Sequence, residues 1–150
     1  MIRPALLLAL LAGPALADGG ACTDGSRWWS FGSMAGLGPC EAPEEGFFVL
    51  ACRDGGVIVD VESPFAVAEG DPVEAVLEVD GTPFALRGEG TLFGRTGVIG
   101  LGRAPVPAQA VAALRAGAAA RFVLPTETRD IHLSGSSRAI GAMTARCRSE

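Results

Sequence analysis

The only histidine of the chain lies in a strand-like segment that also carries an aspartate and a serine. In residues 130–134 (DIHLS), the alternation of a strand places Asp130, His132 and Ser134 on one face. These are the residue types of a hydrolytic triad. Same-face neighbours on one strand stand about 6.5–7 Å apart, however, whereas a nucleophile needs its base within hydrogen-bond distance. We therefore expect a polar strand face, and a small hydrolase that uses His132 is the weakest of our functional hypotheses.

Three aromatic residues near the N-terminus are a second candidate site. Trp28, Trp29 and Phe31 lie within Arg27–Met34, an aromatic-rich segment that predicts a strand. Because adjacent strand residues point to opposite faces, one tryptophan must enter the core and the other can reach the surface. An exposed indole would suit a ligand platform, since it combines a flat apolar surface with a hydrogen-bond donor. Together with the polar strand face described above, this gives four candidate binding residues: Trp28, Trp29, His132 and Ser134.

An acidic loop follows this segment and carries Glu41, Glu44 and Glu45. Clustered carboxylates can bind a cation such as calcium, but solvated surface loops also carry them. The glycine-rich stretches 88–94 and 97–102 lack the lysine and the following helix of a phosphate-binding loop. We expect no metal, no cofactor and no catalytic residue.

Four cysteines, Cys22, Cys40, Cys52 and Cys147, predict two disulfides. Their spacings of 18, 12 and 95 residues contain no Cys-x-x-Cys pair, which argues against a zinc or redox site. Four cysteines allow three connectivities. We favour Cys40–Cys52, which would close a short local loop, together with Cys22–Cys147, which would tie the two ends of the chain together.

The first residues of the chain have the pattern of a signal peptide over residues 1–17. Arg3 supplies a positive charge, a short apolar run follows, and Ala15-Leu16-Ala17 matches a signal peptidase site. The apolar run of about 12 residues is shorter than the roughly 20 that a transmembrane helix needs. We expect cleavage near Ala17, no transmembrane span in the mature chain, and a location in the periplasm or outside the cell.

Charge is distributed unevenly along the chain. Residues 18–89 hold 14 acidic residues and 3 arginines, whereas residues 90–150 hold 3 acidic residues and 8 arginines. The formal net charge of the whole chain is −5, which argues against nucleic acid as a partner. The two halves could form opposed binding faces or could interleave and neutralise one another, and we favour interleaving.

Frequent turn residues between short apolar segments predict a mainly β fold in the first two-thirds of the chain. The chain contains 21 glycines and 10 prolines, so turns are frequent. Apolar or alternating segments between these turns predict strands, and the glycine-rich residues 88–102 predict only short ones. The expected strands, in addition to the aromatic segment, are Phe47–Cys52, Val57–Val61, Val73–Asp80, Phe84–Arg87, Leu92-Phe93 and Val98–Leu101.

The C-terminal part has a different pattern. Pro107 begins an alanine-rich segment that ends at Gly117, which predicts a helix at about 107–116. Strands at 119–124 and 130–134 follow.

A last helix is expected at about 136–147, with Ser136 or Ser137 as its N-cap. Met143 and Cys147 share one face of it, so Cys147 should face the core. We conclude that residues 18–150 form a single disulfide-stabilised β-rich domain, a β-sandwich or partly open barrel with these two helices.

The C-terminal third resembles a group of small proteobacterial periplasmic proteins. The resemblance rests on LRAG at 114–117, RFV at 121–123 and IHLSGSSRAI at 131–140, and ends at Cys147. It is to the invasion-associated locus B family and the type VI secretion accessory proteins of the VasI/TagO kind. Over residues 107–147, it implies a periplasmic β-rich domain without catalytic residues that acts through contacts with envelope components.

A shorter segment resembles the opening of periplasmic C-type lysozyme inhibitors. Residues 47–61 (FFVLACRDGGVIVDV) contain a strand, a cysteine, an Asp-Gly turn and a second strand, and Ser134-Gly135 is similar to a Ser-Gly element of that family. The second half departs from the pattern, because two helices stand where the inhibitors continue as barrel strands.

Our preferred expectation is a non-enzymatic interaction protein of the envelope. Its partner would be an envelope protein or a peptidoglycan-associated component, and no nucleic acid. A lysozyme-type inhibitor is the alternative.

Overall fold

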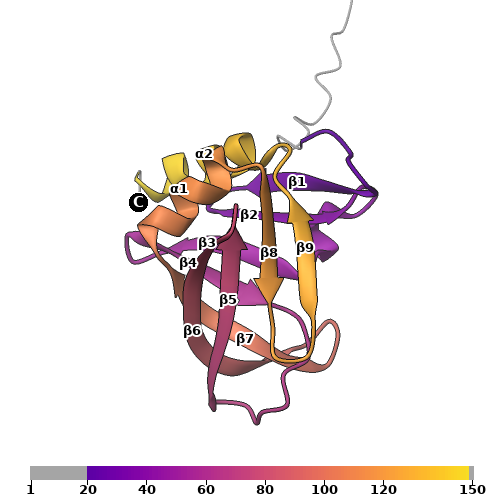
Figure 1. Ribbon diagram of the computed structural model, residues 1–150, viewed down its shortest axis with the longest axis vertical. Coiled ribbons are helices and arrows are strands. Elements are labelled where there is room, and N and C mark those ends of the chain that lie inside the picture. Colours follow the sequence, from indigo (N-terminus) through magenta and orange to yellow (C-terminus); the bar gives the residue numbers. More distant parts are fainter. Residues whose placement is uncertain (1–19, 149–150) are drawn as a thin grey trace, which may run out of the picture.

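The computed structural model describes residues 20–148, so the predicted signal peptide lies outside the described residues. These residues form one antiparallel sheet of nine strands with two helices and one 3-10 turn (Figure 1). Neither helix is long and apolar enough to cross a membrane. The elements are β1 (Ser26–Phe31), β2 (Met34–Pro39), η1 (Pro43–Glu45), β3 (Phe48–Arg53), β4 (Gly56–Val61), β5 (Pro72–Val79), β6 (Thr82–Phe93), β7 (Val98–Val106), α1 (Ala108–Ala116), β8 (Ala119–Val123), β9 (Thr128–His132) and α2 (Ser136–Cys147).

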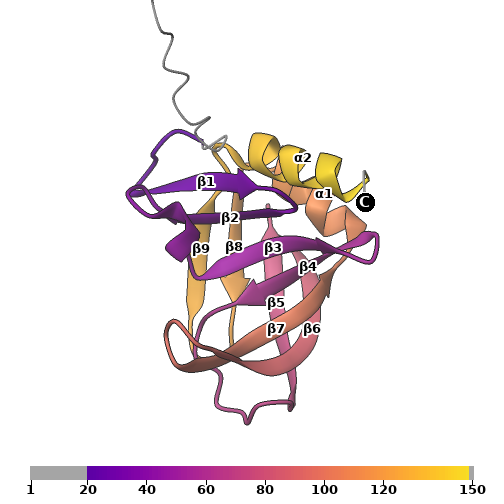
Figure 2. The same ribbon diagram turned by 180° about the vertical axis from the view of Figure 1, so that it is seen from behind.

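The sheet curls into a half-barrel. Its strand order is β1-β2-β3-β4-β7-β6-β5-β8-β9. The curl brings the edge strands β1 and β9 towards each other, and both helices lie over one end of the barrel (Figures 1 and 2). The prediction of a mainly β fold, with a partly open barrel and two helices, is confirmed, and both helices begin within one residue of the expected position.

The inner face of the sheet and the helices enclose one apolar core. Trp28 and Phe48 pack edge to face with ring centroids 5.7 Å apart, and Phe48 and Phe122 pack at 5.0 Å. Leu114 of α1 and Ile140 of α2 are fully buried against this cluster. Full burial of a side chain of this size contributes about 1.5–3 kcal/mol. Since neither helix has a side-chain N-cap, this burial holds them in place.

The start of α2 differs from the predicted serine cap. Gly135 occupies the N-cap position with a φ of 94°, a conformation that glycine adopts without strain. Ser136 is buried, and its hydroxyl lies 2.6 Å from the carbonyl oxygen of Leu114 and 2.8 Å from that of Leu133. This serine therefore joins the end of α1 to the start of α2.

The segment Arg27–Met34, predicted as one strand, is a hairpin. The chain turns at Gly32, where φ is 56°, and returns as β2 through residues that we expected to form a loop. A single glycine with positive φ was enough to reverse the chain.

Two glycines of β2 made this strand look like a loop in the sequence. They are glycines because neighbouring groups pack closely against the strand at these positions. A Cβ atom on Gly36 would lie 3.1 Å from the indole nitrogen of Trp29, and one on Gly38 would collide with the carbonyl oxygen of Pro43 in η1. The missing side chains therefore leave space for the Trp29 indole and for the backbone of η1 against the strand.

The strands β6 and β7 are longer than the short strands predicted in the glycine-rich region. A Cβ atom on Gly88 would collide with the carbonyl oxygen of Gly102, and one on Gly100 with that of Val61. Here glycine marks the close approach of neighbouring backbones in a curled sheet, not a turn.

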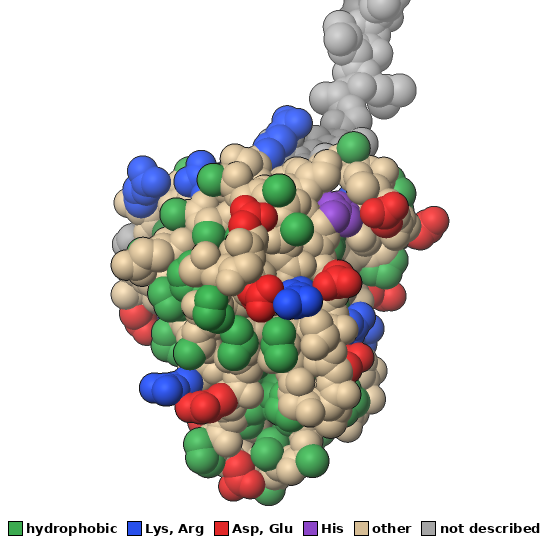
Figure 3. Space-filling view, in the orientation of Figure 1, with side chains coloured by type: hydrophobic (Ala, Val, Ile, Leu, Met, Phe, Trp, Pro, Cys, Tyr) green, Lys and Arg blue, Asp and Glu red, His purple; other side chains and the backbone are tan. Residues whose placement is uncertain are grey.

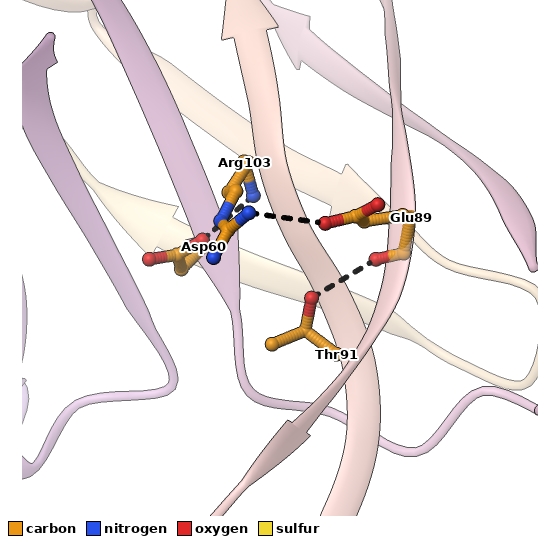
Figure 4. Close-up of polar contacts among 4 residues, drawn as sticks. All are labelled: Asp60, Glu89, Thr91 and Arg103. Atoms are coloured by element: carbon orange, nitrogen blue, oxygen red, sulfur yellow. Dashed lines mark hydrogen bonds and ion pairs between the residues drawn. The ribbon is translucent and has the colours of Figure 1, made fainter. Parts of the chain in front are cut away.

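A bulge bends the sheet where β4 meets β7. The register of the two strands shifts there, and Arg103 has a φ of 55°. The backbone N–H of Arg103 donates to Asp60 Oδ1 at 2.7 Å, and its guanidinium lies 3.4 Å from Glu89 of β6 (Figure 4). The hydroxyl of Thr91 donates to the carbonyl oxygen of Glu89 at 3.4 Å. Side chains of three strands thus hold this bend.

All four cysteines form disulfides, but the favoured pairing is wrong. Cys22 is bonded to Cys40, and Cys52 is bonded to Cys147. The hairpin of β1 and β2 returns the chain to its starting point, which brings Cys22 and Cys40 together. Cys147 is half-buried, and its bond to Cys52 ties α2 to β3. Our argument from loop length failed because strand topology, and not sequence distance, sets which cysteines meet.

The acidic and basic halves of the chain interleave, as we expected. The strand β7 lies between β4 and β6, and β8 lies beside β5. Three ion pairs join the halves, and acidic and basic side chains lie side by side on the surface (Figure 3). These pairs are Arg95–Glu62, Arg121–Glu78 and Arg103–Glu89.

Candidate functional site at the seam between β1 and β9

Side chains join the two edge strands of the half-barrel where they meet. The indole nitrogen of Trp28 on β1 donates to the main-chain carbonyl of His132 on β9 at 2.7 Å. The Nε2 atom of His132 lies 3.1 Å from the hydroxyl and 3.2 Å from the carbonyl oxygen of Ser26. The structure thus brings together two residues singled out from the sequence, and adds Ser26, which was not.

The contact between Ser26 and His132 lacks the features of a catalytic pair. With the ring proton on Nε2, the imidazole donates to the carbonyl and hydroxyl oxygens of Ser26, and in that tautomer Nε2 does not accept the hydroxyl proton. The Nδ1 atom is buried without a hydrogen-bond partner among the described residues, whereas a catalytic histidine is oriented by a third group. This geometry fits a polar link across the seam.

The prediction that one of the two tryptophans is exposed is wrong. Trp28 is fully buried and Trp29 is 9% exposed. Trp29 lies on the outer face of β1 over Gly36, and the missing side chain there lets the indole sink against the sheet. Phe31, at the tip of the hairpin, is the exposed aromatic residue, at 71%.

The remaining sequence candidates do not join the histidine. Ser134 is exposed in the turn before α2, and Asp130 is exposed on β9. Within residues 20–148, the polar contacts of the imidazole are with Ser26. Over the same residues, no group of three or more carboxylate, imidazole or thiol side chains is placed to hold a metal ion, and this includes the acidic loop.

Two adjoining clefts lie beside the joined edges. One has a volume of about 440 Å³ and the other about 430 Å³, and they share Asp24, Ser26, Leu37 and Asp130. We call the two together the seam cleft. The larger part extends past Phe47 to the turn between β6 and β7, and the smaller part reaches His132.

Acidic side chains dominate the larger part of the seam cleft. Four carboxylates line it against two arginines. Arg95 is paired with Glu62 at 2.8 Å, and the guanidinium of Arg129 lies 3.8 Å from the ring centroid of Phe47. The unequal count leaves a negative rim, and Figure 3 shows acidic side chains near the histidine at this edge. The four carboxylates belong to Asp24, Glu45, Glu62 and Asp130.

The backbone of β9 presents hydrogen-bonding groups to the seam cleft. The N–H of Leu124 donates to the carbonyl of Glu127, which closes the β8–β9 hairpin with a hydrogen-bonded pair. In an antiparallel ladder, hydrogen-bonded and non-hydrogen-bonded pairs alternate, so Thr128, Asp130 and His132 turn their N–H and C=O groups away from β8. The bond from Trp28 to the carbonyl of His132 agrees with this assignment.

None of the family models, curated proteins and solved structures with which the chain was compared matches it. The resemblances to the invasion-associated group and to lysozyme inhibitors therefore stay predictions.

Proposed function

We propose that this protein is a non-enzymatic interaction protein of the bacterial periplasm, and that it binds an extended, positively charged segment of an envelope partner in the seam cleft. The observation that carries the proposal is the open edge of β9 beside an acidic cleft. The two disulfides fit a protein that folds outside the cytoplasm.

An extended segment matches the main-chain geometry of this edge. The N–H and C=O groups of Thr128 and Asp130 point away from β8, and Asp130 lines the cleft, so a partner strand could pair with this edge. The indole of Trp28 already satisfies the carbonyl of His132, so the segment would pair with β9 ahead of that residue.

Charge favours a basic segment over an acidic one. Asp24, Glu45 and Asp130 are exposed around the cleft, and opposite charges on a ligand would be attracted to them. The ring of Phe47, held under the guanidinium of Arg129, offers an apolar contact in the same cleft.

Binding of a generic probe tests the proposal. We expect a fluorescent ten-residue peptide of alternating arginine and threonine to bind in a fluorescence anisotropy titration, and its glutamate–threonine counterpart not to bind. Asp130→Pro removes the N–H that faces the cleft and should abolish binding. Asp130→Asn keeps that N–H and should weaken binding only severalfold. Absence of binding by the basic peptide, or equal binding by wild type and Asp130→Pro, would contradict the proposal.

A lysozyme-type inhibitor is the second candidate. The strands β3 and β4 pair across the Asp54-Gly55 turn, which is the strand–turn–strand form on which that resemblance rests. Stoichiometric inhibition of a muramidase in a cell-wall turbidity assay would support this candidate, and undiminished lysis at excess protein would remove it.

A further inference from the structure

A second groove lies at the helical end of the barrel, away from the seam cleft. It has a volume of about 410 Å³ and runs between α1, the last turn of α2 and the first residues of β4. The two helices lie side by side over this end (Figures 1 and 2). The residues that line it include Val57, Val106, Val111, Arg115, Thr144 and Arg148.

The floor of this groove is apolar. Val57 at the start of β4 and Val111 of α1 are half-buried and pack against the core, and Val106 at the end of β7 is buried. Alanines of α1 complete the wall. A ligand would bury alkyl surface here, at roughly 25 cal/mol for each Å² removed from water.

The rim of the same groove is positive. Arg115 and Arg148 line it, and no acidic side chain of residues 20–148 does. Four other arginines of the chain are paired with glutamates, at distances of 2.7–3.4 Å. Neither Arg115 nor Arg148 forms an ion pair with any of residues 20–148. Two guanidinium groups at one groove, without a counter-charge from the described part of the chain, would be stabilised by an anion.

Arg115 and Arg148 lie along the same face of α2. A Cβ atom on Gly141 would lie 3.3 Å from Nη2 of Arg115, so this guanidinium lies across α2 where a side chain is missing. Gly141, Thr144 and Arg148 follow one another at spacings of three and four residues and therefore share a face of the chain's last helical turns.

We propose that this groove binds a medium-chain fatty acid, with the carboxylate at Arg115 and Arg148 and the alkyl chain on the valine floor. The volume lies in the usual range for small-molecule sites. Arginine pairs with carboxylates through two parallel hydrogen bonds, which fixes the head of such a ligand. The site is separate from the seam cleft, so it does not depend on the function proposed above.

Calorimetric titration with decanoate, below its micelle concentration, tests the proposal. We expect saturable binding of one decanoate per chain, no binding of acetate, which lacks the alkyl chain, and no binding of decyltrimethylammonium, which has the opposite charge. The double variant R115Q/R148Q should bind decanoate at least tenfold more weakly. The control variant R87Q, which removes a paired and exposed arginine on β6, should bind as wild type does.

A groove-filling variant separates the site from general charge effects. Ala108→Phe keeps both arginines and should also block decanoate, with an unchanged circular dichroism spectrum as evidence of folding. Equal binding of decanoate and decyltrimethylammonium, unchanged binding by R115Q/R148Q, or no binding by the wild type would overturn the proposal.

Discussion

The indole nitrogen of Trp28 donates a hydrogen bond to the main-chain carbonyl of His132, 104 residues further along the chain. This bond joins the first and last strands of a sheet whose edges do not pair through their backbones at this point. The smaller part of the seam cleft reaches His132, and the backbone groups of Asp130 ahead of it turn away from β8.

The two buried tryptophans provide a matched test of this bond. Both substitutions Trp28→Phe and Trp29→Phe remove the same atoms, but Trp28 has a hydrogen-bond partner and Trp29 has none among the described residues. Leaving a buried carbonyl without its donor costs about 1–3 kcal/mol. We expect Trp28→Phe to lower the free energy of unfolding by about 1–2 kcal/mol more than Trp29→Phe in urea titrations. Equal losses would contradict the bond.

The two disulfides should differ in their contribution to stability. Cys52–Cys147 spans 95 residues and Cys22–Cys40 spans 18. The loss of loop entropy in the unfolded chain gives about 4.7 and about 3 kcal/mol for loops of these lengths. We expect the paired alanine variant of Cys52 and Cys147 to unfold at lower denaturant than that of Cys22 and Cys40. The reverse order would contradict this account, and peptide mapping without reduction checks the pairing itself.

Glycine 38 should not tolerate a side chain. A Cβ atom at Gly38 would collide with the backbone of Pro43 and Gly46, which cannot move as a flexible side chain could. We expect Gly38→Ala to destabilise the protein by at least about 2 kcal/mol in thermal and chemical unfolding. Gly94→Ala is the control, because nothing lies within 4 Å of its added Cβ atom, and a change within about 0.5 kcal/mol is expected.

The bulge between β4 and β7 should depend on the carboxylate of Asp60. Asp60→Ala leaves the N–H of Arg103 without its acceptor, and we expect a loss of about 1–2 kcal/mol in the free energy of unfolding. Asp60→Asn keeps an oxygen acceptor at the same position and should lose less. If neither substitution changed the free energy of unfolding, the side chain of Asp60 would not stabilise the bulge.

Local sequence signals predicted the helices and several hairpins well. Pro107 and Gly117 bracket α1, and the Asp-Gly pairs at Asp54 and Asp80 turn the chain between expected strands, because the residues that set these boundaries lie within or beside the elements themselves. His132 and Trp28 were singled out separately, and their contact across the seam was not predicted.

Features that depend on contacts between different elements could not be predicted in the same way. The glycines of β2 are explained by Trp29 and η1, and the partner of His132 is Ser26, 106 residues away. The disulfide pairing depends on the β1–β2 hairpin, which we had taken for one strand and a loop. The glycine contacts and the Cys22–Cys40 bond follow from the β1–β2 hairpin, whereas the contact of His132 with Ser26 forms only when the two edge strands meet.

Site-specific photo-crosslinking in the cell tests the central claim most directly. A photoreactive residue at position 130 lies at the seam cleft, and one at Ala85, exposed on β6, lies three strands away in the sheet order. The account predicts that position 130 captures one envelope protein, through a segment that mass spectrometry shows to be net basic, and that position 85 does not. Capture of the same proteins from both positions, or of none from position 130, would contradict it.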